Sequence, residues 1–311
     1  MGIFSKPEVI ILKESNEAKE YLAKLQELLP RASGEVASKI EREIAVVNAG
    51  IYGEENILFE LKNSGMDLVV LHDLYLKTES GLTAQIDYLV LTPKFYYVIE
   101  CKNLVGNIEI NNNGDFIRTF QYGSRKHKEG IYSPITQNER HLNVLKEARL
   151  DGKNILMKVL VNATFGSVYK GIVVLANPKT VVNDRFAKKE VKEKVIRADQ
   201  LISYIRETNQ SYKGPVMSLK DLLEIGESYL NLDHPDRPDY LEKYEDLVRE
   251  TEVTAPSAAV SPSEDADAVM TCPRCGSPLV MRTAKKGDNA GNQFYGCSAF
   301  PKCRYVKNME K

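Results

Sequence analysis

The feature that most constrains this chain is a group of four cysteines near its C-terminal end. Cys272 and Cys275 are separated by two residues, and Cys297 and Cys303 follow further along. Four thiolates at this spacing predict one tetrahedral Zn²⁺ site, and because protein ligands fill every position, the site should be structural. A unit of about 40 residues rarely folds on its apolar core alone, so the metal would supply folding free energy. Buried free thiols are the alternative.

The remainder of the chain is long enough for one large folded unit. Of the 311 residues, 43% are hydrophobic and 27% are charged, which are ordinary values for a globular protein. Residues 251–270 contain Ala, Ser, Pro and acids but no Lys or Arg, a composition typical of a linker. We therefore expect a helical segment at 1–45, a core at 46–231, a linker with a possible short helix at 232–270, and the zinc module at 271–311.

The net charge of -1 hides an uneven distribution. Residues 271–311 contain eight Lys and Arg against two acids, so the zinc module is basic and suited to nucleic acid. No apolar run approaches the roughly 18 residues that a membrane span needs. The N-terminus also lacks a signal-peptide pattern, and the fifth cysteine, Cys101, stands alone. These observations predict a soluble, cytoplasmic protein in a reducing compartment.

Hydrophobic periodicity predicts an α/β core. Residues 14–62 repeat apolar side chains at helical spacing, and short β-rich runs begin after residue 67. Strands are expected at 68–76, 83–91, 95–102, 108–110, 116–120, 171–176 and 195–197, and helices at 134–150, 199–206, 219–230 and 239–250.

Two of the predicted strands place acids opposite each other. A turn centred on residues 93 and 94 makes the numbers of cross-strand partners sum to 187, so Asp87 would face Glu100. The two-residue period of a strand places Lys102 on the same side as Glu100. Facing carboxylates among apolar neighbours repel each other, and Mg²⁺ would relieve that repulsion. The alternative is a solvated face on which Lys102 is an ordinary ion-pair partner.

The segments around these acids resemble the catalytic signature of the PD-(D/E)xK nuclease superfamily, and in particular its nuclease-related domain, NERD. The resemblance rests on residues 50–54, 71–74, 85–90, 98–103 and 133–137. Ile86 stands where the signature often has Pro. The resemblance implies a restriction-endonuclease-like mixed sheet flanked by helices.

The resemblance also implies roles for individual residues. Asp87 and Glu100, with the backbone carbonyl of Cys101, would hold Mg²⁺ or Mn²⁺, and Lys102 would serve the attacking water. Glu54 would add a carboxylate to the metal site, and Gln137 would orient active-site groups or contact the substrate. Read without the resemblance, Glu54 only favours a helix N-terminus, Gln137 is a surface residue, and the Cys101 side chain packs in the core.

The remaining polar candidates have simpler interpretations. The four histidines show no metal-binding spacing, and we expect them to be structural or exposed: His72, His127, His141 and His234. The basic run at 125–128 could contact phosphates, but an exposed loop is the expected structure.

The cysteine module resembles the zinc finger at the C-terminal end of bacterial type I DNA topoisomerases, over residues 271–306. The resemblance implies a small zinc-ribbon-like β module that binds DNA, commonly single-stranded. Residues expected to contact nucleic acid by stacking or by charge are Arg274, Phe294, Tyr295, Lys302 and Arg304. The aromatic residues could instead pack the small core.

Together these features predict a Mg²⁺-dependent nuclease that hydrolyses phosphodiester bonds of DNA or RNA, with DNA favoured. The zinc finger would hold nucleic acid near the core. Two alternatives remain open. One is a non-catalytic nucleic-acid-binding or adaptor protein with a nuclease-like fold, and the other is a zinc module that docks a protein partner.

Overall fold

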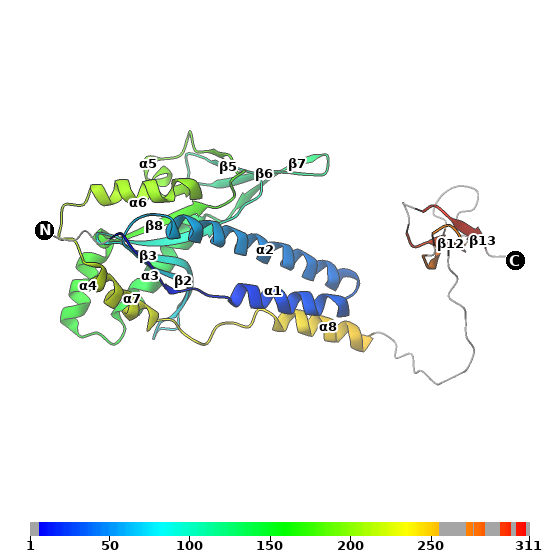
Figure 1. Ribbon diagram of the computed structural model, residues 1–311, viewed down its shortest axis with the longest axis horizontal. Coiled ribbons are helices and arrows are strands. Elements are labelled where there is room, and N and C mark those ends of the chain that lie inside the picture. The colour runs from blue at the N-terminus through cyan, green and yellow to red at the C-terminus, as the bar shows by residue number, and fades with distance from the viewer. Residues whose placement is uncertain (1–5, 255–271, 276, 284–292, 300–302, 309–311) are drawn as a thin grey trace. The chain divides into compact units, whose positions relative to one another are not determined.

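The structure is a computed structural model that describes residues 6–254, 272–275, 277–283, 293–299 and 303–308 (Figure 1). The chain divides into two compact units, residues 1–255 and 256–311, which are considered separately. Within the described ranges, no helix combines the length and apolar character that crossing a membrane requires.

A six-stranded mixed sheet forms the centre of the first unit, in the order β1-β2-β3-β4-β8-β10. Its strands are β1 (Val9–Lys13), β2 (Leu68–Lys77), β3 (Thr83–Leu91), β4 (Tyr96–Lys102), β8 (Tyr169–Leu175) and β10 (Val195–Arg197). The β2–β3–β4 meander is antiparallel, whereas β1 pairs with β2, β8 with β4, and β10 with β8 in parallel. The central strands are apolar on both faces because helices cover both faces.

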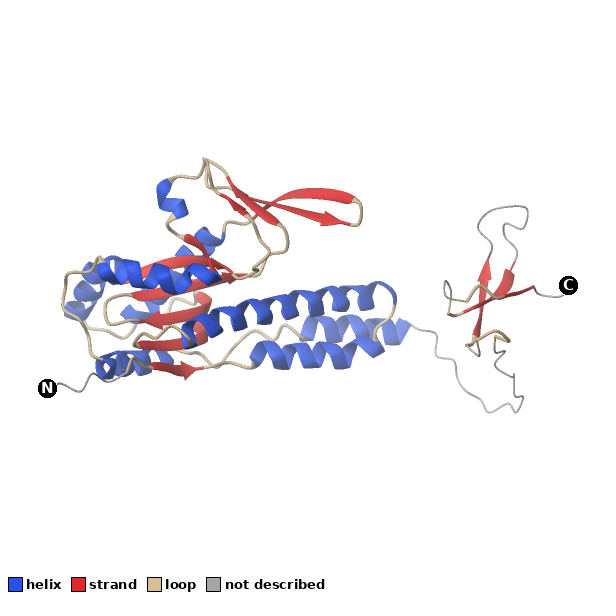
Figure 2. Cartoon of the chain, turned by 45° about the horizontal axis from the view of Figure 1, so that its top comes forward, coloured by secondary structure: helices blue, strands red, loops and turns tan. Residues whose placement is uncertain are grey.

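The described part of the first unit has seven helices longer than one turn, and five of them pack on the sheet (Figure 2). The seven helices are α1 (Glu17–Leu28), α2 (Gly34–Lys62), α3 (Pro134–Leu150), α4 (Ile155–Val168), α6 (Leu201–Gln210), α7 (Leu219–Leu230) and α8 (Glu242–Thr254). Short helical turns are η1 (Leu29–Arg31), α5 (Lys189–Lys192) and η2 (Ala198–Gln200). Helices α3, α4 and α7 pack on one sheet face, and α2 and α6 pack on the other, while α1 and α8 pack against α2. The predicted α/β fold with a mixed sheet between helices is confirmed.

The ends of α3 show how local sequence positions it. Ser133 is the N-cap and its side chain accepts a hydrogen bond from the backbone N–H of Thr136, while Pro134 occupies the first turn. The buried residues Val144 and Leu145 then face the sheet. The expected bounds of this helix, 134–150, are those observed.

The helical part of the first unit departs from the expected segment boundaries. Helix α2 runs through residues 45 and 46 without a break. Helix α8 packs against α1 and α2 through Tyr244 and Val248, together with Leu241 just before it. Residues 232–254 therefore pack with the first unit. The short helix expected at 239–250 within the linker segment corresponds to α8. The apolar spacing of three and four residues at 241, 244 and 248 was the available signal.

A second, four-stranded sheet has the strand order β7-β6-β5-β9, and three of its strands follow β4 in the sequence. Its strands are β5 (Asn107–Ile110), β6 (Phe116–Tyr122), β7 (Arg125–Ile131) and β9 (Val182–Asn183). The β6–β7 hairpin projects from the body of the unit in both views (Figures 1 and 2). Residues 125–128 were expected to form an exposed loop. They are exposed, but they belong to strand β7, so the loop assignment is wrong. Their side chains are exposed, so no apolar alternation marked the strand.

The second unit contains a three-stranded antiparallel sheet in the order β11-β12-β13. Its strands are β11 (Leu279–Thr283), β12 (Gln293–Cys297) and β13 (Val306–Asn308). This small β module with clustered cysteines agrees with the predicted architecture.

Candidate functional site

The predicted acids lie where strands β3 and β4 separate. The two strands pair in the expected register as far as Tyr88 and Ile99, while β3 remains paired with β2 down to Thr83. Asp87 and Glu100 are the next positions beyond the last β3–β4 pair. The backbone N–H of Cys101 donates to Asp87 Oδ2 at 2.6 Å. The Asp87 carboxylate thus takes the place of a ladder hydrogen bond at this fork.

Glu100 is buried on the α3 side of the fork, with 2% of its side chain exposed. Its Oε1 lies 2.6 Å from Lys102 Nζ, and its Oε2 lies 3.2 Å from His141 Nδ1 on α3. The second distance is within ion-pair range, but the geometry is not that of a hydrogen bond, and Oε2 has no hydrogen-bond partner among the described residues. His141, which was expected to be structural or exposed, thus contacts a candidate site residue. Its position one turn after Gln137 was the signal in the sequence.

Negative charge accumulates at the fork. Burial raises the pKa of Asp87 well above its ordinary value, the charges of Glu100 and Glu54 raise it further, and the Cys101 N–H and Lys102 only partly oppose them. Burial likewise raises the pKa of the Cys101 thiol, and its side chain packs on the core beneath α2, as expected. A bound cation would stabilise the charged form of Asp87 and so offset this rise in its pKa.

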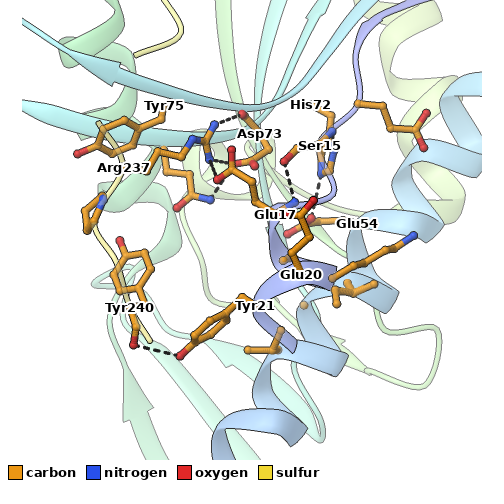
Figure 3. A pocket seen from close by; sticks show the side chains of 18 of the residues that line it. Ser15, Glu17, Glu20, Tyr21, Glu54, His72, Asp73, Tyr75, Arg237 and Tyr240 are labelled. Carbon is orange, nitrogen blue, oxygen red and sulfur yellow. Dashed lines mark hydrogen bonds and ion pairs between the residues drawn. The ribbon is translucent and has the colours of Figure 1, made fainter. Parts of the chain in front are cut away.

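Glu54 reaches this region from the other side of the sheet, on α2. Its Oε2 lies 2.9 Å from Nε2 of His72, whose ring stacks on Tyr88 with centroids 4.7 Å apart. The Tyr88 hydroxyl donates to the backbone carbonyl of Glu54 at 2.8 Å, which fixes the helix against the strand. Figure 3 shows Glu54 and His72 directed toward each other. His72 is thus structural, as expected, but it supports a candidate site residue.

The fit to a divalent cation rests on Asp87 and Glu100. Both carboxylates lie at the fork, and Glu100 Oε2 is a buried oxygen that accepts no hydrogen bond among the described residues. Glu54 is engaged with His72, and the only described group of three or more acidic, His or Cys ligand atoms within 4.8 Å is the cysteine cluster. One or two carboxylates with water and substrate oxygens are sufficient for Mg²⁺. Gln137 lies half-buried on α3, one turn before His141.

Gly53 brings α2 close to the end of β4. A Cβ there would lie 2.7 Å from Asn103 Cβ and 3.1 Å from Cys101 Sγ, whereas a Cβ at Gly50 on the same helix would meet nothing within 4 Å. We expect Gly53→Ala to lower the free energy of unfolding by about 1–3 kcal/mol through overpacking. Gly50→Ala should raise it by up to about 1 kcal/mol through helix propensity. Chemical denaturation measures both, and equal shifts would contradict the close packing.

A cavity of about 540 Å³ adjoins Glu54 (Figure 3). Its wall includes His72, Gln85 and Tyr88 from the sheet and residues of α1, α2 and 237–241. At its inner end, Arg237 lies 2.8 Å from Asp73 Oδ1, which also accepts from Gln85 Nε2 at 2.7 Å. Asp73 has a positive φ of 61°, which is uncommon outside glycine. Sequence reasoning missed this contact because Arg237 lay in the expected linker.

The four predicted zinc ligands do lie together. Cys272 Sγ is 3.7 Å from Cys303 Sγ, and Cys275 Sγ is 3.4 Å from Cys297 Sγ. A tetrahedral ion with Zn–S distances of about 2.3 Å places its sulfurs about 3.8 Å apart. The cluster therefore fits Zn²⁺ with all four positions filled by protein.

The candidate nucleic-acid contacts of the zinc module do not form one surface. Arg274 and Arg304 are exposed. Phe294 and Tyr295 are consecutive on β12, so their side chains point to opposite sheet faces, and a single stacking platform would not contain both. Lys302 lies outside the described residues.

Comparisons with known proteins agree with this architecture. The first unit has a mixed α/β fold with acids at a strand fork, and the second has a four-cysteine β module. Residues 49–175 match the nuclease-related domain family, NERD, and residues 269–311 match the topoisomerase DNA binding C4 zinc finger family. Both predicted resemblances are confirmed.

Curated relatives are similar over short stretches only. An uncharacterized protein of Haemophilus influenzae is 42% identical over 40 residues, which is 13% of this chain and 20% of that protein. DNA topoisomerase 1 of Methanothermobacter thermautotrophicus is 36% identical over 56 residues, 18% of this chain and 7% of that protein. DNA topoisomerase 1 of Mycoplasma genitalium is 53% identical over 34 residues, 11% of this chain and 4% of that protein. The chain thus spans a small part of each, and the search of solved structures gives no match.

Proposed function

We propose that the first unit is a Mg²⁺-dependent nuclease that hydrolyses phosphodiester bonds of DNA, with RNA as the alternative substrate. The observation that supports this most is the strand fork. It brings a desolvated Asp87, a buried Glu100 whose Oε2 makes no hydrogen bond among the described residues, and Lys102 Nζ into one place. The match to the nuclease-related domain supports the same conclusion.

In this proposal Asp87 and Glu100, with the Cys101 carbonyl, hold Mg²⁺ or Mn²⁺. The ion, when bound, polarises a phosphate oxygen and lowers the pKa of a water ligand. His141 steadies the Glu100 carboxylate from α3, as an outer-shell partner commonly does for a metal ligand. Lys102 donates hydrogen bonds from Nζ to the attacking water or to a phosphate oxygen, and its positive charge offsets the charge that develops there.

Glu54 and Gln137 have supporting roles in this proposal. Glu54 is held by His72 on the α2 side and adds negative charge near Asp87, which favours the bound cation. Gln137 lies on α3 beside His141, where an amide can orient a carboxylate or a phosphate oxygen. The zinc module would bind nucleic acid through Arg274 and Arg304, and the connecting segment would raise the local substrate concentration.

The test is cleavage of single- and double-stranded DNA and RNA by the purified full chain with Mg²⁺ or with EDTA. We expect Glu100→Gln and Lys102→Met each to reduce the rate by about 100-fold or more. The matched controls are Glu224→Gln and Lys220→Met, which remove the same chemical groups from an exposed ion pair on α7. Equal residual activity in all four variants would identify a contaminant. Mn²⁺ binding that is absent by calorimetry would favour the non-catalytic binding protein instead.

A further inference from the structure

We propose that the β6–β7 hairpin is a second nucleic-acid-binding surface, which contacts phosphates with its basic edge and stacks an unpaired base on its aromatic side. The inference rests on the proposed function, because the nucleic-acid strand bound by the hairpin would be the substrate cleaved at the neighbouring fork. It assigns a binding role to residues outside both the metal site and the zinc module.

One side of the hairpin presents a stack of planar groups. Phe120 on β6 is paired with His127 on β7, and their rings lie nearly parallel with centroids 5.5 Å apart and an interplanar angle of 19°. The guanidinium carbon of Arg118 lies 4.4 Å from the centre of the Phe120 ring. Proteins that bind single-stranded nucleic acid use aromatic rings and Arg guanidinium planes in this way, because every base has a stacking face.

The edge of the hairpin is basic and exposed. Strand β7 is the outermost strand of its sheet, and residues 125–130 are all exposed. Lys128 Nζ forms an ion pair with Glu109 Oε2 at 3.4 Å, whereas Arg125 and Lys126 make no ion pair within the described ranges. Exposed cations without a protein counter-ion are suited to phosphates, which release counter-ions when they bind.

The hairpin lies close to the segment that follows β4, from which β5 separates it in the sequence. Strand β4 ends at Lys102, and Arg118 Nε donates to the carbonyl of Val105, three residues later, at 2.9 Å. Gly106 has a φ of 103°, and a Cβ there would lie 2.8 Å from Phe120 Cβ and would also collide with the carbonyl of Thr119. The stack of Arg118, Phe120 and His127 therefore begins near the end of β4 and extends outward along the hairpin. A nucleic-acid strand bound at the fork could continue along this surface.

The simpler explanation is that the charges protect an edge strand from pairing with another chain. That role requires charge but not a particular sign, so Lys→Glu changes would satisfy it equally well. Nucleic-acid binding requires positive charge. Charge reversal therefore separates the two explanations.

The decisive experiment measures binding of a fluorescent single-stranded DNA oligonucleotide to the full chain with zinc bound, in EDTA-free buffer without Mg²⁺. We expect the triple variant Arg125→Glu, Lys126→Glu, Lys128→Glu to bind roughly tenfold or more weakly than the parent. The slope of log Kd against log salt should fall by about 2, as expected for three lost phosphate contacts on a single strand. The control Lys153→Glu, Lys158→Glu, Lys213→Glu changes the net charge equally at exposed positions elsewhere. Equal affinities of the two triple variants would overturn the proposal.

A second measurement separates the hairpin from the zinc module. DNA containing 5-iodouracil, crosslinked by light to a full chain that carries Asp87→Asn, should yield adducts in the peptide containing residues 116–131. Adducts confined to the zinc module would contradict the proposal. Because neither experiment requires cleavage, a failed nuclease assay with intact hairpin binding would refute only the proposed catalytic function.

Discussion

Replacement of Asp87 with Asn is expected to abolish cleavage and, at the same time, to make the metal-free protein more stable. Asn keeps an oxygen that can accept the hydrogen bond from the Cys101 N–H, which measures 2.6 Å in the structure. It removes the charge that is repelled by Glu100 and Glu54 and poorly solvated at the fork. We expect the free energy of unfolding to rise by about 1–2 kcal/mol, and the cleavage rate to fall by about 1,000-fold or more.

The pH dependence follows from the direction of the pKa shift. The pKa of Asp87 is raised in the folded state, so the native protein holds this proton more tightly than the unfolded chain does. Wild-type stability without metal should therefore decline as the pH rises above the ordinary carboxyl range, and the advantage of Asp87→Asn should grow over the same interval. At a pH low enough to protonate Asp87 in both states, the two proteins should differ little.

Thermal unfolding with and without Mn²⁺ tests this expectation. The ion should raise the Tm of the wild type and leave that of Asp87→Asn nearly unchanged, because a principal ligand is missing. The control Asp246→Asn removes a carboxylate from an exposed pair on α8, where little change is expected. Loss of activity together with lowered stability would show that Asp87 is structural, and an unchanged rate would exclude it from the chemistry.

The register of the β3–β4 hairpin could be predicted because it depends on local sequence. The separation of the strands could not, and Asp87 and Glu100 lie just beyond the last cross-strand pair instead of forming the expected one. A short turn sets the register of a hairpin, and here the side chain of Thr92 accepts the N–H of Phe95 and closes the turn. Every β3–β4 pair then follows by counting, including the pair formed by Tyr88 and Ile99. The four zinc ligands were predictable for a similar reason, since their spacing already implies one metal.

The partners of the acids could not be predicted because tertiary packing alone brings them together. His141 and Glu100 are on different elements, and His72 meets Glu54 only because α2 crosses β2. Helix α4 was also missed, because exposed apolar residues such as Ile155 and Leu156 do not show the amphipathic pattern of a surface helix.

The helix at 239–250 was expected, but the packing of residues 232–254 on the first unit was not, for a physical reason as well. The composition of this segment is polar and contains prolines, which is typical of a linker, yet the polar groups are satisfied by a network within the first unit. Asp233 Oδ1 accepts the backbone N–H of Tyr75 at 2.8 Å, and Asp233 Oδ2 lies 2.6 Å from Lys13 Nζ. Composition does not distinguish polar groups that face water from polar groups that have protein partners.

Within this network, replacement of Arg237 is expected to have the largest effect on the free energy of unfolding. Its guanidinium is 15% exposed and lies 2.8 Å from Asp73, 3.0 Å from Glu17 and 3.3 Å from Asp233. Asp73 is itself only 10% exposed, so Arg237→Met would leave a nearly buried carboxylate without its cation. Removal of one partner from a buried pair costs about 3–5 kcal/mol, and we expect a loss of about 3 kcal/mol here because the pair is not fully enclosed.

The pH dependence of this loss has the opposite sign to that of Asp87. Burial alone would raise the pKa of Asp73, but hydrogen bonds from Ser15 and Arg237 outweigh it and hold the pKa below its ordinary value. The stabilisation is present above the carboxyl range and is lost as the pH falls through the depressed pKa of Asp73. The difference between wild type and Arg237→Met should therefore be largest near neutral pH and should shrink in acid.

Chemical denaturation of Arg237→Met, Asp73→Asn and the double variant measures the coupling directly. We expect the double variant to lose less free energy of unfolding than the sum of the two single losses. Each single change leaves one buried charge without its partner, whereas the double change removes both charges. Arg249→Met, on the exposed face of α8, is the matched control, and its loss should be below about 1 kcal/mol. Asp73 also accepts from Gln85, two residues before Asp87, so Arg237→Met should reduce cleavage as well as stability. If the single losses simply add, the network does not act as a unit, and 232–254 is a separable addition to the core.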